Sequence, residues 1–113
     1  MARKRRVQVV TVAGDLTLAT AERYREQLIS EMAQVPRVLL SLSQATELDA
    51  AGIQLLIAAK RTAQAGEGTF QITGSIPEAI AKRLVQSGLS QTHLHEGTEL
   101  DSVLDLLVQG ASE

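Results

Sequence analysis

The chain has 113 residues, which fits one domain and leaves little room for a second. Apolar residues make up 44% and charged residues 21% of the sequence, a balance that excludes wholesale disorder. Without cysteine the chain has no disulfide, thiolate metal ligand or cysteine nucleophile, and no apolar run reaches the roughly 18 residues of a membrane helix. We therefore expect one soluble, cytoplasmic domain with a core of Leu, Ile, Val and Ala.

Charge is distributed unevenly along the sequence. Four of the eleven basic residues are consecutive, from Arg3 to Arg6, so we expect residues 1–6 to be a basic flexible tail. Residues 7–109 then form the domain, and residues 110–113 form a loose end. In the rest of the chain seven basic residues stand against thirteen acidic ones, a net charge of −6. Such an acidic body argues against nucleic-acid binding, and the tail is either a solvated end or a weak contact for phosphates.

Strand and helix signals alternate along the chain. Short β-branched or apolar runs predict strands at Val7–Ala13, Arg37–Leu42, Thr69–Thr73 and Thr92–His95. Between and after them, apolar residues recur at helical spacing in four segments. This alternation predicts an α/β domain with a four- or five-stranded, mainly parallel sheet and about four helices packed largely on one face.

Turn and cap residues delimit the predicted helices. Thr20 is a predicted N-cap for the first helix, which ends before Pro36, and Gly14-Asp15 marks a turn or bulge. The second helix runs to Ala65. Ser75-x-x-Glu78 has the spacing of a capping box for the third helix, and Thr98-x-x-Asp101 has a similar spacing for the fourth. The glycines expected to end the second and third helices are Gly66 and Gly88.

The sequence contains no phosphate-binding loop, dinucleotide-binding glycine motif, zinc-protease motif or nucleophile elbow. His93 and His95 would share one face of a strand, and Glu96 or Glu99 could add a carboxylate to a metal site. The alternative is a pair of exposed polar residues on a short edge strand, and we favour it because such short matches are common by chance. We expect no metal, no cofactor and no catalytic residue.

The most informative segment is the turn from Asp49 to Gly52, which follows a buried strand and opens a helix. Asp49 is placed to accept hydrogen bonds from free N–H groups near Ala51 and Gly52. A glycine in the first helical turn costs about 1 kcal/mol relative to alanine, so a close backbone approach or a bare surface for a partner would account for Gly52. A plain capped helix packed on the sheet is the alternative.

These features resemble the STAS domain, the fold of anti-sigma factor antagonists and of the tails of sulfate transporters. The resemblance rests on the Val-rich first strand, the turn after it, the strand Val38–Leu42 and the run Leu48–Ile53, with support from Ile72 and from Ile80–Leu89. It extends from about Val7 to Leu107. The resemblance implies a protein-interaction module that binds a sigma-regulating kinase or a chemotaxis-type signalling protein.

The family usually has Asp-Ser-Ser-Gly or Asp-Thr-Ala-Gly in this turn, and the hydroxyl residue before the glycine is phosphorylated in anti-sigma factor antagonists. Here that position is Ala51, and Ala50 before it also has no hydroxyl group. The family switch is therefore lost, or engineered away, or moved to another residue such as Thr46 or Ser43. Without the switch, the resemblance implies a constitutive binding module.

We predict that the partner binds around Asp49, Ala50, Ala51 and Gly52 and along the polar side of the following helix. Gln54, Lys60 and Arg61 are the candidates on that side. One alternative is a STAS accessory subunit of an Mla-type lipid-transport complex, which the sequence resembles less closely. The other is a nucleotide-binding domain with its phosphate at the start of this helix, where the Asp49 carboxylate disfavours an anion. We expect a monomer or weak dimer.

Overall fold

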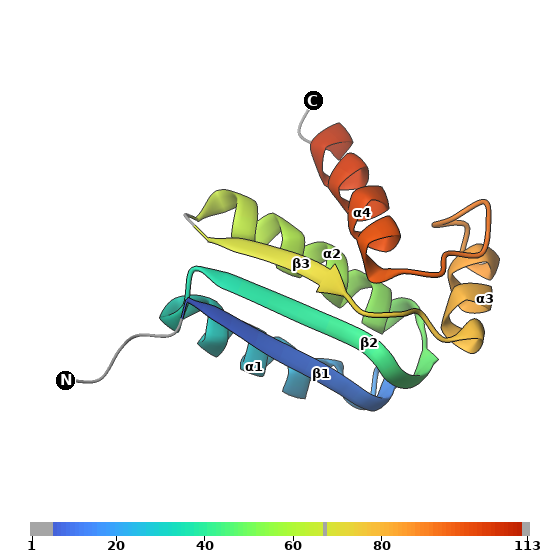
Figure 1. Ribbon diagram of the computed structural model, residues 1–113, viewed down its shortest axis with the longest axis horizontal. Helices are drawn as coiled ribbons and strands as arrows, with labels where there is room; N and C mark the ends of the chain where they lie inside the picture. Colours follow the sequence, from blue (N-terminus) through green and yellow to red (C-terminus); the bar gives the residue numbers. More distant parts are fainter. Residues whose placement is uncertain (1–5, 67, 112–113) are drawn as a thin grey trace.

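A computed structural model describes residues 6–66 and 68–111 (Figure 1). Three strands of this part of the chain form one parallel sheet in the order β1-β2-β3. The elements in chain order are β1 (Val7–Leu16), α1 (Ala21–Gln34), β2 (Arg37–Leu48), α2 (Ala50–Ala65), β3 (Thr69–Thr73), α3 (Glu78–Gln86) and α4 (Gly97–Ala111). The predicted α/β class with a parallel sheet is confirmed, with three strands in the described residues where the sequence predicted four or five.

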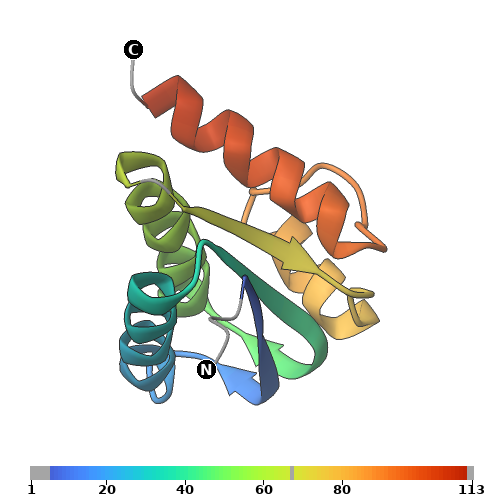
Figure 2. The same cartoon turned by 60° about the vertical axis from the view of Figure 1, so that its left-hand side comes forward.

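The helices are not all on one face of the sheet. In both views α1 and α2 lie side by side against one face, α3 lies near the carboxyl ends of the strands, and α4 runs beside β3 (Figures 1 and 2). Side chains from all three strands enter the core beneath α1 and α2, and the two aromatic residues Tyr24 and Phe70 are also buried there. The aliphatic core expected from composition is confirmed.

The predicted strand Thr92–His95 does not form. Only an isolated antiparallel bridge between Ser75 and Glu96 lies next to it. The physical reason lies at the free edge of β3, where a further strand would have to pair. Helix α4 occupies that edge, and its Asp101 carboxylate accepts a hydrogen bond from the N–H of Ile72 at 2.8 Å. A side chain takes the place of a fourth strand.

Three predicted helix caps form differently. The Thr20 hydroxyl does not cap α1 but accepts from the N–H of Thr17 and donates to the carbonyl of Asp15. Helix α3 begins after Pro77 without a side-chain cap, so the capping box with Ser75 is absent. Helix α4 begins before Thr98. The cap at its start comes from Glu99, whose Oε1 accepts from the N–H groups of His95 and Glu96.

The glycines predicted to form a bulge and to end helices lie where they were predicted. Gly14 has a φ of +95° and lies at a register shift of β1 against β2, which makes it the expected bulge. Gly66 and Gly88 follow the ends of α2 and α3. At the other end of the chain, α4 continues through Ala111, so residues 110 and 111 are helical where a loose end was predicted. Residues 1–5 and 112–113 lie outside the described residues.

Candidate functional site

The turn before α2 is held by the two carboxylate oxygens of Asp49. Its Oδ1 accepts from the N–H of Gly52 at 3.0 Å, which caps the helix as predicted. Its Oδ2 accepts from the N–H of Leu18 at 3.0 Å, a residue in the loop between β1 and α1. One side chain thereby fixes the start of α2 to a loop that lies 31 positions earlier in the chain.

The same N–H donors also affect the pKa of the Asp49 carboxyl. The N–H of Leu18 has the largest effect and that of Gly52 follows, and together with the Arg83 guanidinium they hold the pKa of the carboxyl below its ordinary value. The group is therefore ionised at neutral pH. A negative charge that already occupies the N-terminal end of α2 repels a phosphate there, which counts against a nucleotide site at this turn.

Gly52 is buried, and the space around it explains why it is glycine. A Cβ atom at this position would lie 2.2 Å from the carbonyl oxygen of Leu16 and 2.8 Å from the Leu48 Cδ1. The first of these contacts is with backbone, which cannot turn aside as a flexible side chain can. Of the two explanations that the sequence offered, close backbone approach is the correct one. Gly52 shapes the turn and is not part of the surface.

The predicted contact residues therefore separate into two groups. Ala50, Gln54 and Arg61 are exposed at spacings of four and seven residues, so they lie along one side of α2. Ala51 is half-buried and has no hydroxyl group. Lys60, which we predicted on the polar side, is on the other face and is only 4% exposed.

The prediction for Lys60 is wrong because two acidic residues of α4 meet it inside the domain. Its Nζ lies 2.8 Å from Oδ1 of Asp101 and 2.8 Å from Oδ1 of Asp105. Asp101 is also the acceptor for the N–H of Ile72. The ammonium group thus joins α2, α4 and the edge of β3, and a buried lysine is tolerated because it is paired twice. Lys60 holds the fold together and is unavailable to a partner.

The exposed side of α2 borders a groove of about 580 Å³. Ala50 and Gln54 line it on the α2 side, together with Ile53 and Ile57. Arg83 and Leu89 line it from α3 and the turn after that helix, and Leu107 from α4 completes the lining. The side chains combine an apolar surface with one cation, a mixture that suits a protein segment carrying apolar and acidic residues.

Arg83 lines the groove but was not predicted from the sequence as a site residue. Its Nε donates to the carbonyl of Leu48 at 2.9 Å, so α3 is attached to the strand end just before Asp49. The guanidinium is exposed at the groove, where it also acts on the Asp49 carboxyl. The only local signal was a basic residue in the last turn of a short helix, which does not indicate a contact 35 residues away.

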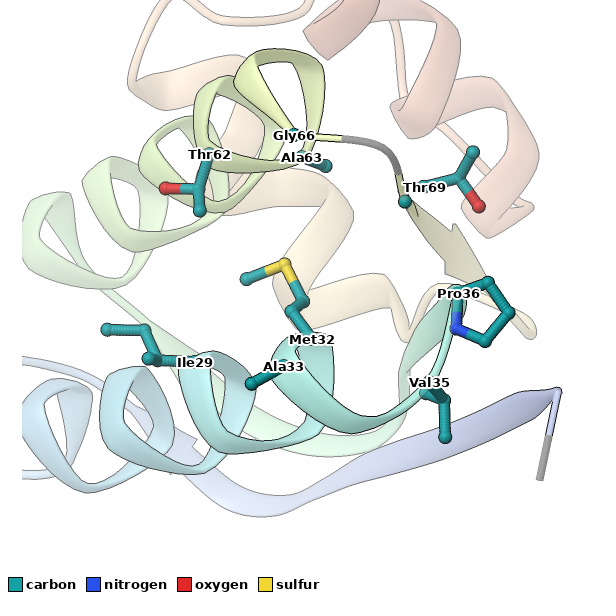
Figure 3. A pocket seen from close by; sticks show the side chains of 10 residues that line it. Ile29, Met32, Ala33, Val35, Pro36, Thr62, Ala63, Gly66 and Thr69 are labelled. Atoms are coloured by element: carbon teal, nitrogen blue, oxygen red, sulfur yellow. The ribbon is translucent and has the colours of Figure 1, made fainter. Parts of the chain in front are cut away.

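A second cavity of about 280 Å³ lies between the carboxyl-terminal halves of α1 and α2. Figure 3 shows Met32 between the two helices, with Ile29 on α1 and Thr62 on α2. The described residues that line it are apolar, glycine, proline or threonine, and none of these has a titratable group for acid–base or metal chemistry. It is a small apolar cleft, separate from the groove beside Ala50.

The two histidines and their candidate carboxylate partners do not form a metal-binding cluster in the described part of the chain. His93 and His95 are exposed on an irregular segment, while Leu94 between them is buried. The Glu99 carboxylate, one candidate partner, is used in capping α4, and this lowers its pKa through the N–H groups of His95 and Glu96. Within residues 6–66 and 68–111 no three histidine, aspartate or glutamate side chains are grouped as a metal site requires.

The alternative phosphorylation sites both lie on β2. Ser43 and Thr46 are exposed, so either hydroxyl could be reached by another protein. The Ser43 hydroxyl is 2.9 Å from that of Ser41 and forms a hydrogen bond with it. Neither residue is next to the start of α2 in sequence, and whether either is modified stays a prediction.

Comparisons with known proteins agree with this architecture. A family model described as "Mlab, STAS domain" matches residues 1–106. The chain belongs to the STAS family. The structure is similar to a sulfate transporter family protein from Wolinella succinogenes, with a TM-score of 0.59 at 16% identity over 91% of this chain and 88% of that one. It is also similar to the STAS domain of a SulP transporter from Vibrio cholerae, with a TM-score of 0.56 at 18% identity over 99% and 89%. No curated protein matches.

At these identities the two solved structures establish the fold of this STAS domain and nothing finer. STAS domains are protein-interaction modules and are generally non-enzymatic, in agreement with the groove and exposed helix side found here. No helix among the described residues is long and apolar enough to cross a membrane.

Proposed function

We propose that this STAS domain is a docking module that binds a signalling protein, such as a sigma-regulating kinase or a chemotaxis-type protein, through the start and exposed side of α2. The observation that carries the proposal is the continuity of two features. The exposed residues Ala50, Gln54 and Arg61 run along α2, and the groove opens directly beside Ala50 and Gln54. We call the three exposed residues and the groove together the docking face.

The chemistry of the docking face defines the partner that fits it. Ala50 has a small side chain, so a partner helix or loop can approach the backbone closely. Leu107 is 38% exposed in the free domain and offers apolar area that a partner can remove from water. Arg61 and Arg83 are exposed cations. The partner segment should therefore carry aliphatic side chains flanked by aspartate or glutamate.

The residue at the family switch position supports constitutive binding. A phosphate on a hydroxyl at position 51 would place about −1.5 to −2 charges beside the ionised Asp49 and repel an acidic partner. Ala51 cannot accept a phosphate. We propose that this domain binds its partner without control at that position, and that partner supply or another site governs the association.

The docking face is tested with any kinase or signalling protein found encoded beside this gene, purified and titrated against the domain by calorimetry. We expect Ala50→Arg and Arg61→Glu each to weaken binding at least about tenfold, because one blocks close approach and the other reverses a charge. Glu26→Arg on the exposed side of α1 is the matched control and should bind as the wild type does. Equal affinity of all four proteins would refute the proposed face.

Phosphorylation has a separate experiment. The domain is incubated with the neighbouring kinase and ATP, and phosphate is located by mass spectrometry. We expect no modification of the wild type, whereas Ala51→Ser should become modified if the kinase still recognises the turn. Phosphate on Ser43 or Thr46 of the wild type would contradict constitutive binding.

The description of the matching family model favours a second candidate, an accessory subunit of an Mla-type lipid-transport complex. In this role the same docking face would bind a subunit of the transporter in place of a signalling protein. Co-expression with the ATPase and permease of such a complex distinguishes the two. Co-purification that Arg61→Glu abolishes supports the transport role, and binding to the kinase alone supports the signalling role.

A further inference from the structure

The loop between β1 and α1 lies next to the docking face. Strands β1 and β2 are parallel, and the last residues that they pair are Leu16 and Leu48. The segments that follow these residues therefore leave the sheet side by side. Leu18 belongs to the first segment and its N–H contacts the carboxylate of Asp49 in the second. Asp49 directly precedes Ala50, so the surface of the docking face continues from α2 to Leu18.

Leu18 is the most exposed large apolar residue in the described part of the chain. It is 80% exposed, and it is not among the residues that line the groove. Turns are formed mostly by glycine, proline, asparagine, aspartate and serine, so the backbone of this loop does not require a leucine. The side chain adds nothing to the core. It leaves apolar area in water that a partner can cover.

The backbone on both sides of Leu18 is held by hydrogen bonds. The N–H of Thr17 donates to the hydroxyl oxygen of Thr20 at 3.1 Å. The carbonyl of Thr17 accepts from the N–H groups of Thr20 and Ala21 at 2.9 and 2.7 Å. Thr17 is also buried, so the loop is attached to the domain directly before Leu18. A loop that is already ordered loses less conformational entropy when a partner binds.

Asp49 uses one carboxylate oxygen more than a helix cap needs. A single acceptor, such as the hydroxyl of serine or threonine, is enough to cap a helix. The Oδ1 of Asp49 does this for the N–H of Gly52. Its Oδ2 accepts from the N–H of Leu18, and this bond is not part of α2. The second oxygen therefore fixes the position of Leu18 relative to the first residues of the docking face.

From these contacts we infer that Leu18 is the apolar anchor of the docking face and that Asp49 is the positioning residue that holds it. The inference rests on the proposed function, because the occupant is the signalling protein that binds there. That protein receives Leu18 in an aliphatic pocket, while its own aliphatic and acidic segment enters the groove. A preorganised leucine in such a pocket adds affinity at a small ordering cost.

The first experiment measures the affinity of the signalling protein that binds the wild-type domain in the calorimetric titrations. Leu18→Ala should raise the Kd at least about tenfold. Its melting temperature should stay that of the wild type, because the side chain is exposed. Leu106→Ala on α4, where the leucine is 71% exposed, is the matched control and should bind as the wild type does. Wild-type affinity of Leu18→Ala, or an equal loss for both variants, overturns the inference.

Two variants of the docking face separate this inference from the proposed function. If Ala50→Arg and Arg61→Glu weaken binding and Leu18→Ala does not, the docking face stands and the anchor is wrong. If all three variants bind as the wild type does, or if no signalling protein binds the domain, the docking function fails and the inference fails with it.

The second experiment tests the positioning role of Asp49. Asp49→Ser retains an acceptor for the N–H of Gly52 and removes the oxygen that holds Leu18. The amide of Leu18 should exchange faster by NMR, and the Kd should rise about threefold to fivefold. In the Leu18→Ala background, Asp49→Ser should leave the Kd unchanged. An equal rise in both backgrounds would mean that Asp49 contacts the partner directly. That result, or unchanged exchange at Leu18, overturns the positioning role.

Discussion

Helix α2 has two faces with different tasks, and neighbouring residues show the contrast. Lys60 is almost fully buried between two aspartates of α4, while Arg61 next to it is exposed on the docking face. Near the other end, Gly52 touches the backbone of β1 and Gln54 borders the groove. The inward residues hold the domain together, and the outward residues are exposed and available to contact a partner.

This contrast shows why polarity alone does not locate a surface. Lys60 and Arg61 have the same charge sign, and both are usually exposed in proteins. What separates them is the position of Asp101 and Asp105, which lie more than 40 residues later in the chain. Substitutions on the inward face should therefore lower the free energy of unfolding. Substitutions on the outward face should instead weaken partner binding and leave the free energy of unfolding nearly unchanged.

The largest loss of stability is expected for Gly52→Ala. The added Cβ would lie 2.2 Å from the Leu16 carbonyl oxygen, so α2 must move away from β1. We expect the free energy of unfolding to fall by about 4 kcal/mol or more, measured by urea denaturation. Gly66→Ala, where the nearest neighbour would be 3.7 Å away, is the control and should change it by less than about 1 kcal/mol. Equal effects at the two glycines would contradict the close approach.

The next largest effect is expected for Lys60→Met, which keeps the length of the side chain and removes its charge. Asp101 would remain buried without its cation, at a cost of about 3 kcal/mol, the lower end for a broken buried pair because Asp105 is partly exposed. Arg61→Met at the adjacent exposed position should leave the free energy of unfolding within about 0.5 kcal/mol.

A double variant sharpens this test. Asp101→Asn retains an acceptor for the N–H of Ile72 and removes the uncompensated charge, so Lys60→Met with Asp101→Asn should recover most of the loss. If the double variant were less stable than Lys60→Met alone, the charge pairing of Lys60 would not be the cause of the effect.

The sequence predicted features that depend on neighbouring residues and missed features that depend on contacts between distant parts of the chain. The cap by Asp49 and the helix ends at Gly66 and Gly88 depend on neighbouring residues, and these predictions are confirmed. The Thr98-x-x-Asp101 pattern failed because Asp101 is used by β3 and Lys60, which no local pattern reveals. Of the residues predicted on the polar side of α2, Gln54 and Arg61 are exposed and Lys60 is buried, and Arg83 was missed because its contact with Leu48 spans the fold.

The smallest of these effects, with its own pH signature, is expected at Asp49. The N–H groups of Leu18 and Gly52 lower its pKa in the folded state, so its contribution to stability is present above the ordinary value of 3.8 and is lost as pH falls through the lowered folded-state pKa. Asp49→Asn keeps one acceptor oxygen and loses the charge, so the melting temperature should be lower than that of the wild type at pH 7. This difference should shrink as pH is lowered to about 2.5 in calorimetric scans, because the wild-type carboxyl becomes neutral. Glu26→Gln on α1 controls for a general loss of negative charge. A difference for Asp49→Asn that stays constant down to the lowest pH would show that the charge of Asp49 does not stabilise the turn that begins the docking face.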